Sequence, residues 1–286
     1  MEGEKPSVYV YIGSEYYTFT ASEKKLADYI LSARDCISRM SISQLASACG
    51  VADATVSRFC RRLGYKGYPD FKISLANSFI GRPEDNPLSG EITREDSLET
   101  ISQKLLTANS LAMTQTLEVL NLETVSQAAK VLHEATKVLC MGQGGSMLIA
   151  AEAAHLFSTI SGKFHPVSDS HMQAMAAAMM EPTDVILFFS YSGSTKDLMD
   201  VLHVARQQHA KSILVTRYPG SPGAALVDVV LQCGSIEGPL QLGSVAARIA
   251  QLYLIDVLFS EMCRRDMERC RHQRELVAEA LSEKHV

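Results

Sequence analysis

The chain has 286 residues, of which 47% are hydrophobic, so it is long enough for two domains with apolar cores and is not expected to be disordered throughout. Its formal net charge of −5 argues against a protein that coats nucleic acid with its whole surface. The sequence has no apolar run of about 18 residues that would span a membrane and no basic start with an apolar stretch that would direct secretion, so we expect a cytoplasmic protein.

Seven cysteines are spread along the chain without a repeated spacing. No pair forms a Cys-x-x-Cys motif, and the spacing of Cys36, Cys49 and Cys60 is not that of a zinc site. We therefore predict reduced thiols, no metal and no cofactor.

Basic residues are concentrated in the N-terminal part. Residues 1–80 contain ten Lys and Arg against eight Asp and Glu, whereas residues 81–286 contain 17 against 24. Within residues 55–72, five side chains are basic and one is acidic. A local basic patch on an acidic protein is compatible with a dedicated DNA-binding surface.

Two capping boxes mark helix starts in the N-terminal part. In Thr20-Ala-Ser-Glu23 the hydroxyl and the carboxylate can bond free amides of a first turn, and Ser41-Ile-Ser-Gln44 repeats this pattern. The second box predicts a short helix over residues 42–49. The side chains expected to face inward are Ile42, Leu45 and Ala46.

A glycine turn separates this helix from the next. Gly50 suits a turn that needs a positive φ, and a third helix is predicted from Asp53 to Leu63. Its apolar residues recur at helical spacing, which predicts a buried face of Val56, Phe59, Cys60 and Leu63. Helix, turn and helix in this order form a helix-turn-helix, whose second helix lies in the major groove of DNA. A helical hairpin with solvated arginines is the alternative.

The outer face of the third helix carries hydroxyls and arginines. Residues near its N-terminus reach base edges, and an Arg there can bond guanine through two hydrogen bonds. Ser43, Gln44, Arg62 and Lys66 are better placed to contact phosphates. The predicted DNA-binding residues are Ser43, Gln44, Thr55, Ser57, Arg58, Arg61, Arg62 and Lys66.

The segments "SISQLA" and "ATVSRFCRRLGYKGYPDFK", with the spacing between them, resemble the N-terminal domain of the RpiR family of bacterial transcriptional regulators. The likeness runs from residue 26 to residue 76. Ala52 stands where the family commonly has a capping Ser, and we expect Asp53 to take over that role. The tyrosine-rich segment before Thr20 is expected either to pack under this domain or to mediate pairing.

A polar segment divides the chain. Residues 81–97 contain Gly, Pro, Asn and charged residues without an apolar period, which is typical of a linker. We predict an all-α helix-turn-helix domain over residues 1–80, a linker over residues 81–100, and a second domain with flanking helices over residues 101–286.

Five short apolar strands alternate with helices in the second domain. They are predicted at residues 138–141, 164–167, 185–189, 213–216 and 227–233. Strands separated by helices imply right-handed crossovers, and strands without polar alternation suit a sheet that is buried on both faces. The predicted fold is a doubly wound parallel α/β sheet, followed by a long apolar helix over residues 244–262.

Two loops at predicted strand ends are rich in glycine and small hydroxyls. Gly142-x-Gly144-x-Ser146 follows the first strand, and Ser190-Tyr-Ser-Gly-Ser-Thr195 follows the third. Ligands of such sheets bind at the carboxyl ends of the strands, near the point where strand order reverses. Glycine lets the backbone approach an anion, and the amides at a helix N-terminus donate to it. The loops therefore predict a phosphate site.

Other chemistries fit these loops less well. Met147 stands at the third position of the dinucleotide fingerprint, and the Gly-Lys-Ser/Thr of a nucleotide P-loop is missing. Ser-Tyr-Ser-Gly-Ser is not the Gly-x-Ser-x-Gly of a serine hydrolase. Helix capping by Ser and Thr would explain one such loop more easily than two.

The two loop patterns resemble those of the sugar isomerase (SIS) domain, a phosphosugar-binding module. Two later segments are also similar to this family, "SPGAALVD" at 221–228 and "GSVAARIAQLYLIDVLF" at 243–259. The resemblance covers residues 120–265 and implies a five-stranded, flavodoxin-like sheet. It also implies that serine and threonine side chains of the loops contact a sugar phosphate, with Ser244 as a secondary candidate. The predicted ligand residues are Gly142, Gly144, Ser146, Ser190, Ser192, Gly193, Thr195 and Ser244.

RpiR regulators join these two kinds of domain in this order. The resemblance implies a regulator of carbohydrate metabolism that binds double-stranded operator DNA and senses a phosphorylated sugar or amino sugar. We expect a homodimer or a dimer of dimers, with the apolar faces of residues 98–120 and 244–262 as candidate interfaces. The alternative is an aldose–ketose isomerase with Glu152 or His171 as its base, but a fused DNA-binding domain favours sensing over turnover. We therefore predict no catalytic residue.

Overall fold

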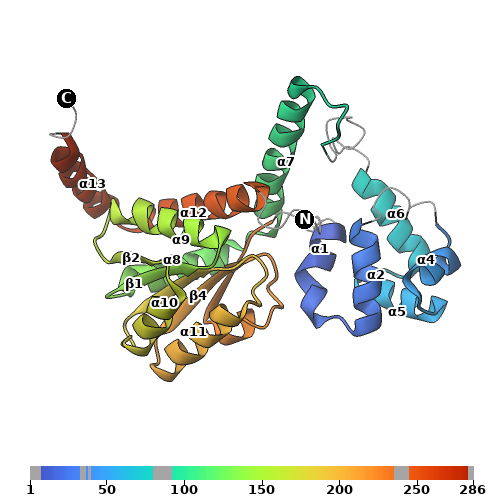
Figure 1. Cartoon of the computed structure of the whole chain (residues 1–286), viewed down its shortest axis with the longest axis horizontal. Helices are drawn as coiled ribbons and strands as arrows, with labels where there is room; N and C mark the ends of the chain where they lie inside the picture. The colour runs from blue at the N-terminus through green and yellow to red at the C-terminus, as the bar shows by residue number, and fades with distance from the viewer. Residues whose placement is uncertain (1–7, 33–36, 38–39, 80–91, 235–244, 283–286) are drawn as a thin grey trace.

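The chain forms a helical N-terminal domain and a C-terminal α/β domain (Figure 1). The computed structural model describes residues 8–32, 37, 40–79, 92–234 and 245–282. Within these residues, no helix is long and apolar enough to cross a membrane. Most of the expected linker lies outside the described residues, which resume at Ile92.

The N-terminal domain is an assembly of short helices. They are α1 (Val8–Glu15), the 3-10 helix η1 (Tyr16–Thr18), α2 (Ala21–Ser32), α4 (Ile42–Cys49), α5 (Asp53–Arg62) and α6 (Tyr68–Phe79). Both capping boxes are confirmed, since the Thr20 amide donates to the Glu23 carboxylate at 2.8 Å and the Ser41 amide donates to Gln44 Oε1 at 2.7 Å. These caps fix the starts of α2 and α4.

The tyrosine-rich segment packs into this domain. Val8, Tyr9 and Ile12 of α1, with Phe19 after η1, are buried among apolar residues of α2, α4, α5 and α6. The ring of Phe19 lies edge-on to that of Phe59 in α5, with centroids 5.1 Å apart. Of the two roles expected for the segment, packing under the domain is the one observed.

The predicted inward faces of α4 and α5 are confirmed with one correction. Val56, Phe59 and Cys60 of α5 and Leu63, which follows its last residue, are all buried, and so are Leu45 and Ala46 of α4. Ile42 is only half-buried, because it is the first residue of α4 and lies at the edge of the domain.

The C-terminal domain contains five parallel strands in the order β2-β1-β3-β4-β5, as a doubly wound sheet requires. The strands are β1 (Val138–Gly142), β2 (Phe164–Val167), β3 (Val185–Phe189), β4 (Lys211–Thr216) and β5 (Val229–Gln232). The helices between them are α9 (Gly145–Ser158), α10 (Ser170–Ala178), α11 (Lys196–Gln207) and the 3-10 helix η3 (Ala224–Leu226). The fold class is confirmed.

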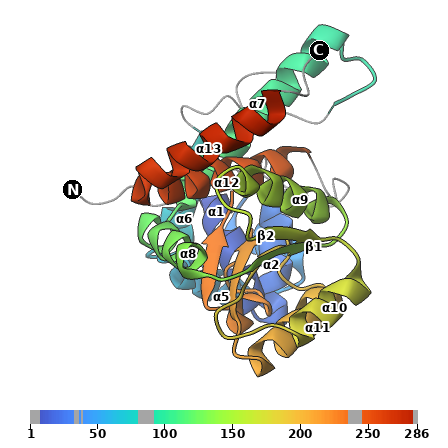
Figure 2. The same cartoon turned by 90° about the vertical axis from the view of Figure 1, so that its left-hand side faces the viewer.

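Helices cover both faces of the sheet (Figures 1 and 2). The sequence of β3 has no alternation of polar and apolar residues because both of its faces are buried. Val185, Leu187 and Phe189 pack into one core, and Ile186 and Phe188 pack into the other. The first core is closed by α8 (Leu122–Glu134), α9 and α12 (Val245–Arg265), and the second by α10 and α11.

The two long helices expected to carry pairing surfaces have different surroundings. The apolar residues of α12 pack inside the domain, against α7 (Leu98–Val119), α8 and α9. The buried residues of that face are therefore used within the domain, and pairing through α12 stays a prediction. Helix α7 extends beyond the sheet (Figure 1) and exposes Leu98, Leu105, Leu106 and Leu117. The final helix, α13 (Met267–Ser282), buries none of its residues.

The backbone of Gly234, after β5, packs directly against α7. A Cβ at Gly234 would lie 2.6 Å from the Gln115 carbonyl oxygen of α7, and the Gly234 amide donates to Thr116 Oγ1 at 3.1 Å. Gly234→Ala is expected to destabilise the α/β domain by about 1–3 kcal/mol, because backbone must move to admit the methyl group. Gly162→Ala is the control, since its Cβ would meet nothing within 4 Å. Equal unfolding free energies for the two variants in urea would contradict this contact.

Candidate functional site

The helix-turn-helix geometry is set by a glycine between α4 and α5. Gly50 has φ of 62°, and its amide donates to carbonyls of the last turn of α4. Ala52 is the N-cap of α5 and provides no side-chain cap. The expectation that Asp53 caps the helix is wrong, because its carboxylate accepts a hydrogen bond of 2.6 Å from Ser43 Oγ instead. This bond ties α4 to the first turn of α5.

The outer face of α5 is polar and accessible. Arg58 and Arg61 are exposed, and Thr55 and Ser57 are half-buried. Arg58 Nη2 donates to Thr55 Oγ1 at 3.4 Å, so these two side chains lie together on one turn of the helix. Thr55, Ser57 and Arg58 thus lie in the first two turns of α5, whereas Arg61 lies in its last turn.

The other predicted phosphate contacts have different surroundings. Lys66 is exposed beyond the end of α5, whereas the side chain of Gln44 completes the capping box of α4. Arg62 donates to the Glu23 carboxylate at 2.7 Å and to the Thr18 carbonyl at 2.8 Å. Arg62 therefore holds the end of α5 to the N-terminal segment.

The carboxylate that receives Arg62 is strongly hydrogen-bonded. Burial raises the pKa of Glu23, but hydrogen bonds from Thr20 and Arg62 outweigh this effect and place the pKa below its usual value. A depressed carboxyl pKa stabilises the fold above the pKa of the unfolded chain, and this contribution is lost as the pH falls through the folded value. Near neutral pH the contact between α5 and the N-terminal segment is fully charged.

The two loops predicted to bind phosphate begin side by side. Strands β1 and β3 are neighbours, with Gly142 in register with Phe189, so the residues that follow both strands leave the same edge of the sheet. The chain continues from β1 to β2 on one side and from β3 to β4 on the other. This edge is therefore the point where strand order reverses, which is where ligands bind in such sheets.

The loop after β1 is shaped by its glycines. A Cβ at Gly142 would lie 2.6 Å from the Ser146 carbonyl oxygen, so only glycine allows the strand to pass this close to α9. Gly144 has φ of 55° and is the N-cap of α9, where it supplies no side chain. The N-terminus of α9 is therefore not covered by a capping side chain. Ser146, in the first turn of this helix, is half-buried.

The loop after β3 orients its hydroxyls through its own backbone. The buried Ser190 Oγ accepts from the Gly193 amide at 3.2 Å, and Ser192 Oγ accepts from the Ser194 amide at 3.3 Å. A serine hydroxyl that accepts a hydrogen bond keeps its own proton to donate. Thr195 is exposed at the N-cap of α11 and does not cap the helix. Ser190, Ser192 and Thr195 thus each keep a hydroxyl proton that no hydrogen bond in the loop uses.

Two residues near this site, Gln173 and Arg248, were not predicted from the sequence. Gln173 of α10 is fully buried, and its amide nitrogen donates to the carbonyls of Gly142 and Val167 at 3.1 and 2.7 Å. It therefore joins the ends of β1 and β2, and its only signal was a polar residue within a Met- and Ala-rich helix. The stem of Arg248 in α12 lies 4.0 Å from the Cβ position of Gly145, beside the start of α9. The predicted contact Ser244 lies outside the described residues.

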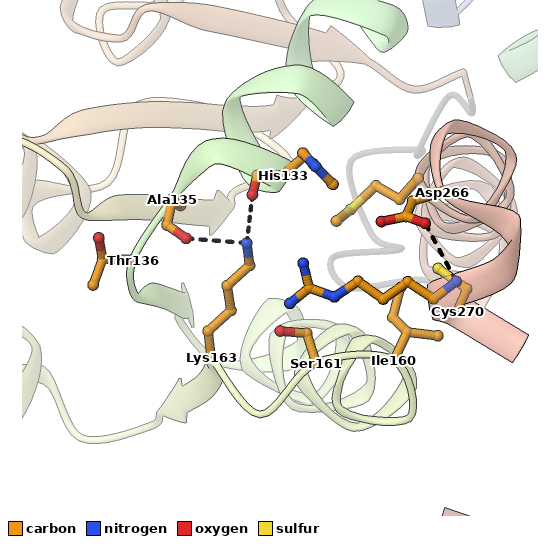
Figure 3. A pocket seen from close by; sticks show the side chains of 10 residues that line it. His133, Ala135, Thr136, Ile160, Ser161, Lys163, Asp266 and Cys270 are labelled. Atoms are coloured by element: carbon orange, nitrogen blue, oxygen red, sulfur yellow. Dashed lines mark hydrogen bonds between the residues drawn. The ribbon is translucent and has the colours of Figure 1, made fainter. Parts of the chain in front are cut away.

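A cavity of about 340 Å³ lies at the opposite edge of the sheet (Figure 3). Lys163 lies in it before β2 and donates to the carbonyls of His133 and Ala135 at 2.8 and 3.0 Å. These carbonyls end α8, so the lysine closes a helix C-terminus. The cavity is distinct from the edge that carries the two loops.

Comparisons with known proteins match both domains. Residues 7–81 match the helix-turn-helix domain of the rpiR family, and residues 131–261 match the SIS domain. An uncharacterised HTH-type transcriptional regulator of Caldanaerobacter subterraneus is 36% identical, over 85% of this chain and 85% of its own length. A second uncharacterised regulator of this type, from Haemophilus influenzae, is 34% identical over 87% of each chain.

Solved structures with this architecture include the NanR protein of Vibrio vulnificus complexed with ManNAc-6P. It has a TM-score of 0.63 and 25% identity, and the match covers 97% of this chain and 99% of that one. The sugar isomerase domain of an RpiR transcription factor from Sphaerobacter thermophilus, at 19% identity and a TM-score of 0.58, shares the fold over 63% of this chain and 98% of its own. Because relatives at 34–36% identity match across both domains, the chain belongs to the RpiR family of helix-turn-helix transcriptional regulators.

Proposed function

We propose that this regulator senses a phosphorylated sugar or amino sugar at the loops that follow β1 and β3. The observation that carries the proposal is the convergence of two helix N-termini, those of α9 and α11, at one edge of the sheet. A phosphate there would accept from backbone amides and from the hydroxyls of Ser146, Ser190, Ser192 and Thr195. Gly142, Gly144 and Gly193 would let it approach the backbone.

The class of ligand draws support from the comparison with NanR, which was solved with ManNAc-6P. That protein matches almost the whole of this chain, so an N-acetylhexosamine 6-phosphate is a suitable first probe. Small hydroxyls recognise a phosphate group without choosing the sugar attached to it. Arg248, beside the start of α9, adds a positive charge at the same edge.

The proposed DNA surface is the outer face of α5. Thr55, Ser57 and Arg58 would read base edges, and Arg61, with Lys66 beyond the helix, would bind the phosphate backbone. Ser43 and Gln44 would approach the backbone from α4. Arg62 is left out of this surface, because its guanidinium is bound within the domain.

Operator recognition is proposed to need two copies of the chain. A two-fold pair would place its α5 helices on half-sites one helical turn of DNA apart, or a multiple of that spacing. The exposed leucines of α7 are the candidate contact between copies, since the apolar face of α12 is used inside the domain.

Sensing without turnover is part of the proposal. The two candidate bases of an isomerase, Glu152 in α9 and His171 at the start of α10, are both exposed to solvent. An aldose–ketose isomerase moves a proton between adjacent carbons and needs its base against the substrate, sheltered from water. Purified protein is therefore expected not to interconvert fructose 6-phosphate and glucose 6-phosphate.

A thermal-shift panel tests the ligand half of this function. N-acetylmannosamine 6-phosphate, N-acetylglucosamine 6-phosphate, glucosamine 6-phosphate and fructose 6-phosphate are compared with their unphosphorylated sugars. At least one phosphate is expected to raise the melting temperature, since a ligand at 100 times its Kd stabilises the folded state by about 2.7 kcal/mol. The unphosphorylated sugars should have no effect, because the loops bind the phosphate. A flat response to the whole panel would refute the proposal.

A further inference from the structure

We infer that the tyrosine-rich segment couples the ligand loop to the DNA-binding helix through a hydrogen bond between Tyr17 and Ser194. This inference rests on the proposed function, because it treats residues 190–195 as the loop that holds the sugar phosphate. Tyr17 Oη and Ser194 Oγ lie 3.0 Å apart, although 177 positions separate them in the sequence. Ser194 is bonded in turn to Ser192, a proposed ligand contact, through its amide.

An aromatic cluster extends this contact across both domains. The ring of Tyr218, in the loop after β4, lies 5.4 Å from Tyr17 and 5.7 Å from Tyr191 between centroids, in edge-on geometry. The ring of Tyr16 lies 6.3 Å from that of Tyr218. Tyr191 belongs to the ligand loop, and Tyr16 and Tyr17 belong to η1. The ring of Tyr218 therefore contacts both the ligand loop and η1.

Two glycines receive side chains from the opposite side of this contact. A Cβ at Gly13 of α1 would lie 2.7 Å from the guanidinium of Arg217, which is 1% exposed. A Cβ at Gly220 would lie 3.1 Å from the Thr18 methyl group. Gln232, at the end of β5, donates to Ser14 Oγ. These glycines leave room for the Arg217 and Thr18 side chains, so the two surfaces pack closely and a shift of the loop after β4 is expected to displace α1 and η1.

The same segment is bound to the recognition helix at its other end. Thr18 follows Tyr17 directly, and its carbonyl and hydroxyl accept from Arg62 at 2.8 and 3.0 Å. Arg62 is the last residue of α5. A continuous series of contacts therefore runs from Ser194 through Tyr17 and Thr18 to α5.

A ligand can use this series only by binding one arrangement better than another. Ser192 and Ser194 lie in the same turn, where the Ser194 amide donates a hydrogen bond to Ser192 Oγ. A phosphate that reorients the Ser192 hydroxyl therefore changes the hydrogen bond that positions Ser194. Tyr17 then gains or loses its partner, and α5 follows through Thr18 and Arg62. Whether the ligand strengthens or weakens DNA binding depends on which arrangement binds DNA. In either case, the size of the change in DNA affinity depends on the hydrogen bond between Tyr17 and Ser194.

A ligand-free double-mutant cycle tests the contact itself. Tyr17→Phe and Ser194→Ala each remove one hydroxyl, and hydrogen exchange of residues 8–18 reports the docking of the segment. Each single variant is expected to raise exchange about two- to tenfold, the worth of one hydrogen bond, and the double variant should add nothing further. Tyr16→Phe is the matched control, because the Tyr16 hydroxyl donates to Asp28 at 2.8 Å inside the N-terminal domain. Its effect should simply add to that of Ser194→Ala.

A second arm measures coupling to the ligand. Operator DNA is first selected from random sequences with the purified chain, and its Kd is measured with and without the sugar phosphate that stabilises the wild type in the panel above. The measured quantity is the ratio of the operator Kd with sugar phosphate to the Kd without it. In Tyr17→Phe this ratio is expected to lie about two- to tenfold closer to one than in the wild type, whereas Tyr16→Phe should keep the wild-type ratio.

The outcomes separate this inference from the proposed function. If the sugar phosphate still binds Tyr17→Phe and changes its DNA affinity by the wild-type factor, the coupling role is wrong while the sensor stands. Additive effects of Tyr17→Phe and Ser194→Ala on exchange would also overturn it. If no sugar phosphate binds the wild type, the proposed function fails, and the coupling inference, which rests on it, falls with it.

Discussion

Replacing both Arg58 and Thr55 with alanine is expected to abolish specific operator binding. Arg58 is exposed on the outer face of α5, and its guanidinium lies 3.4 Å from Thr55 Oγ1, so the two side chains lie together on the surface proposed to read DNA. A bidentate contact between Arg and guanine contributes about 1–3 kcal/mol, which corresponds to a loss of about 5- to 150-fold in affinity for Arg58 alone. Neither side chain is part of the domain core, so the fold should survive.

Fluorescence anisotropy with a selected operator and a scrambled duplex measures this effect. Only binding to the operator should fall, because base contacts supply specificity while phosphate contacts bind any sequence. Arg206→Ala, at an exposed arginine of α11 in the other domain, is the control for loss of positive charge. Retained preference of the double variant for the operator would exclude this face of α5 as the reading surface.

Loss of Ser190 or Ser192 is expected to weaken sugar-phosphate binding about 10- to 150-fold for each serine. This range corresponds to one hydrogen bond to a charged group, about 1.5–3 kcal/mol. Ser190→Ala should leave the turn in place, because the Gly193 amide donates to the Ser190 carbonyl as well as to its hydroxyl, at 3.2 Å in both cases. The loss should therefore reflect the missing donor.

Isothermal titration with the sugar phosphate found in the panel measures both variants. Ser158→Ala is the matched control, because this exposed serine at the end of α9 donates only to a carbonyl of its own helix, 2.6 Å away. Wild-type affinity in both Ser190→Ala and Ser192→Ala would place the ligand elsewhere in the molecule.

Features that depend on neighbouring residues could be predicted from the sequence. The boxes at Thr20 and Ser41 each join residues three positions apart, so the starts of α2 and α4 followed directly. Strands β2 and β3 also begin and end where expected, because apolar runs bounded by polar turns mark buried strands. β5 is shorter than expected, at Val229–Gln232, because the run around it includes Asp228, whose carboxylate instead accepts from the Ser212 amide at 2.7 Å.

The location of the two loops proposed to bind the ligand followed from topology, but the residues that pack beside them did not. Parallel strands with helical crossovers put Gly142 and Ser190 at the same edge whatever the details of packing. Gln173 and Arg248 reach that edge from α10 and α12, and nothing in their local sequence indicates this approach. Periodicity shows which face of a helix is buried, but not against which segment it packs.

The contacts of charged side chains were the least predictable. Arg62 was assigned to DNA phosphates because it lies on the outer face of α5, yet Glu23 and Thr18 bind it across 39 and 44 positions of sequence. Long flexible side chains choose among several partners within reach, and only the folded arrangement decides between them. The apolar face of α12 was likewise assigned to pairing, whereas the chain itself covers that face.

Operator affinity with and without sugar phosphate, in the wild type and in Ser192→Ala, is the most direct measurement of sensing by this regulator. We expect a sugar phosphate that stabilises the wild type to change its operator Kd at least fivefold, the lower range of allosteric coupling of about 1–3 kcal/mol. Ser192→Ala should bind the operator as the wild type does without ligand and should lose that response. An operator affinity that the bound sugar phosphate leaves unchanged in the wild type would contradict sensing through this domain.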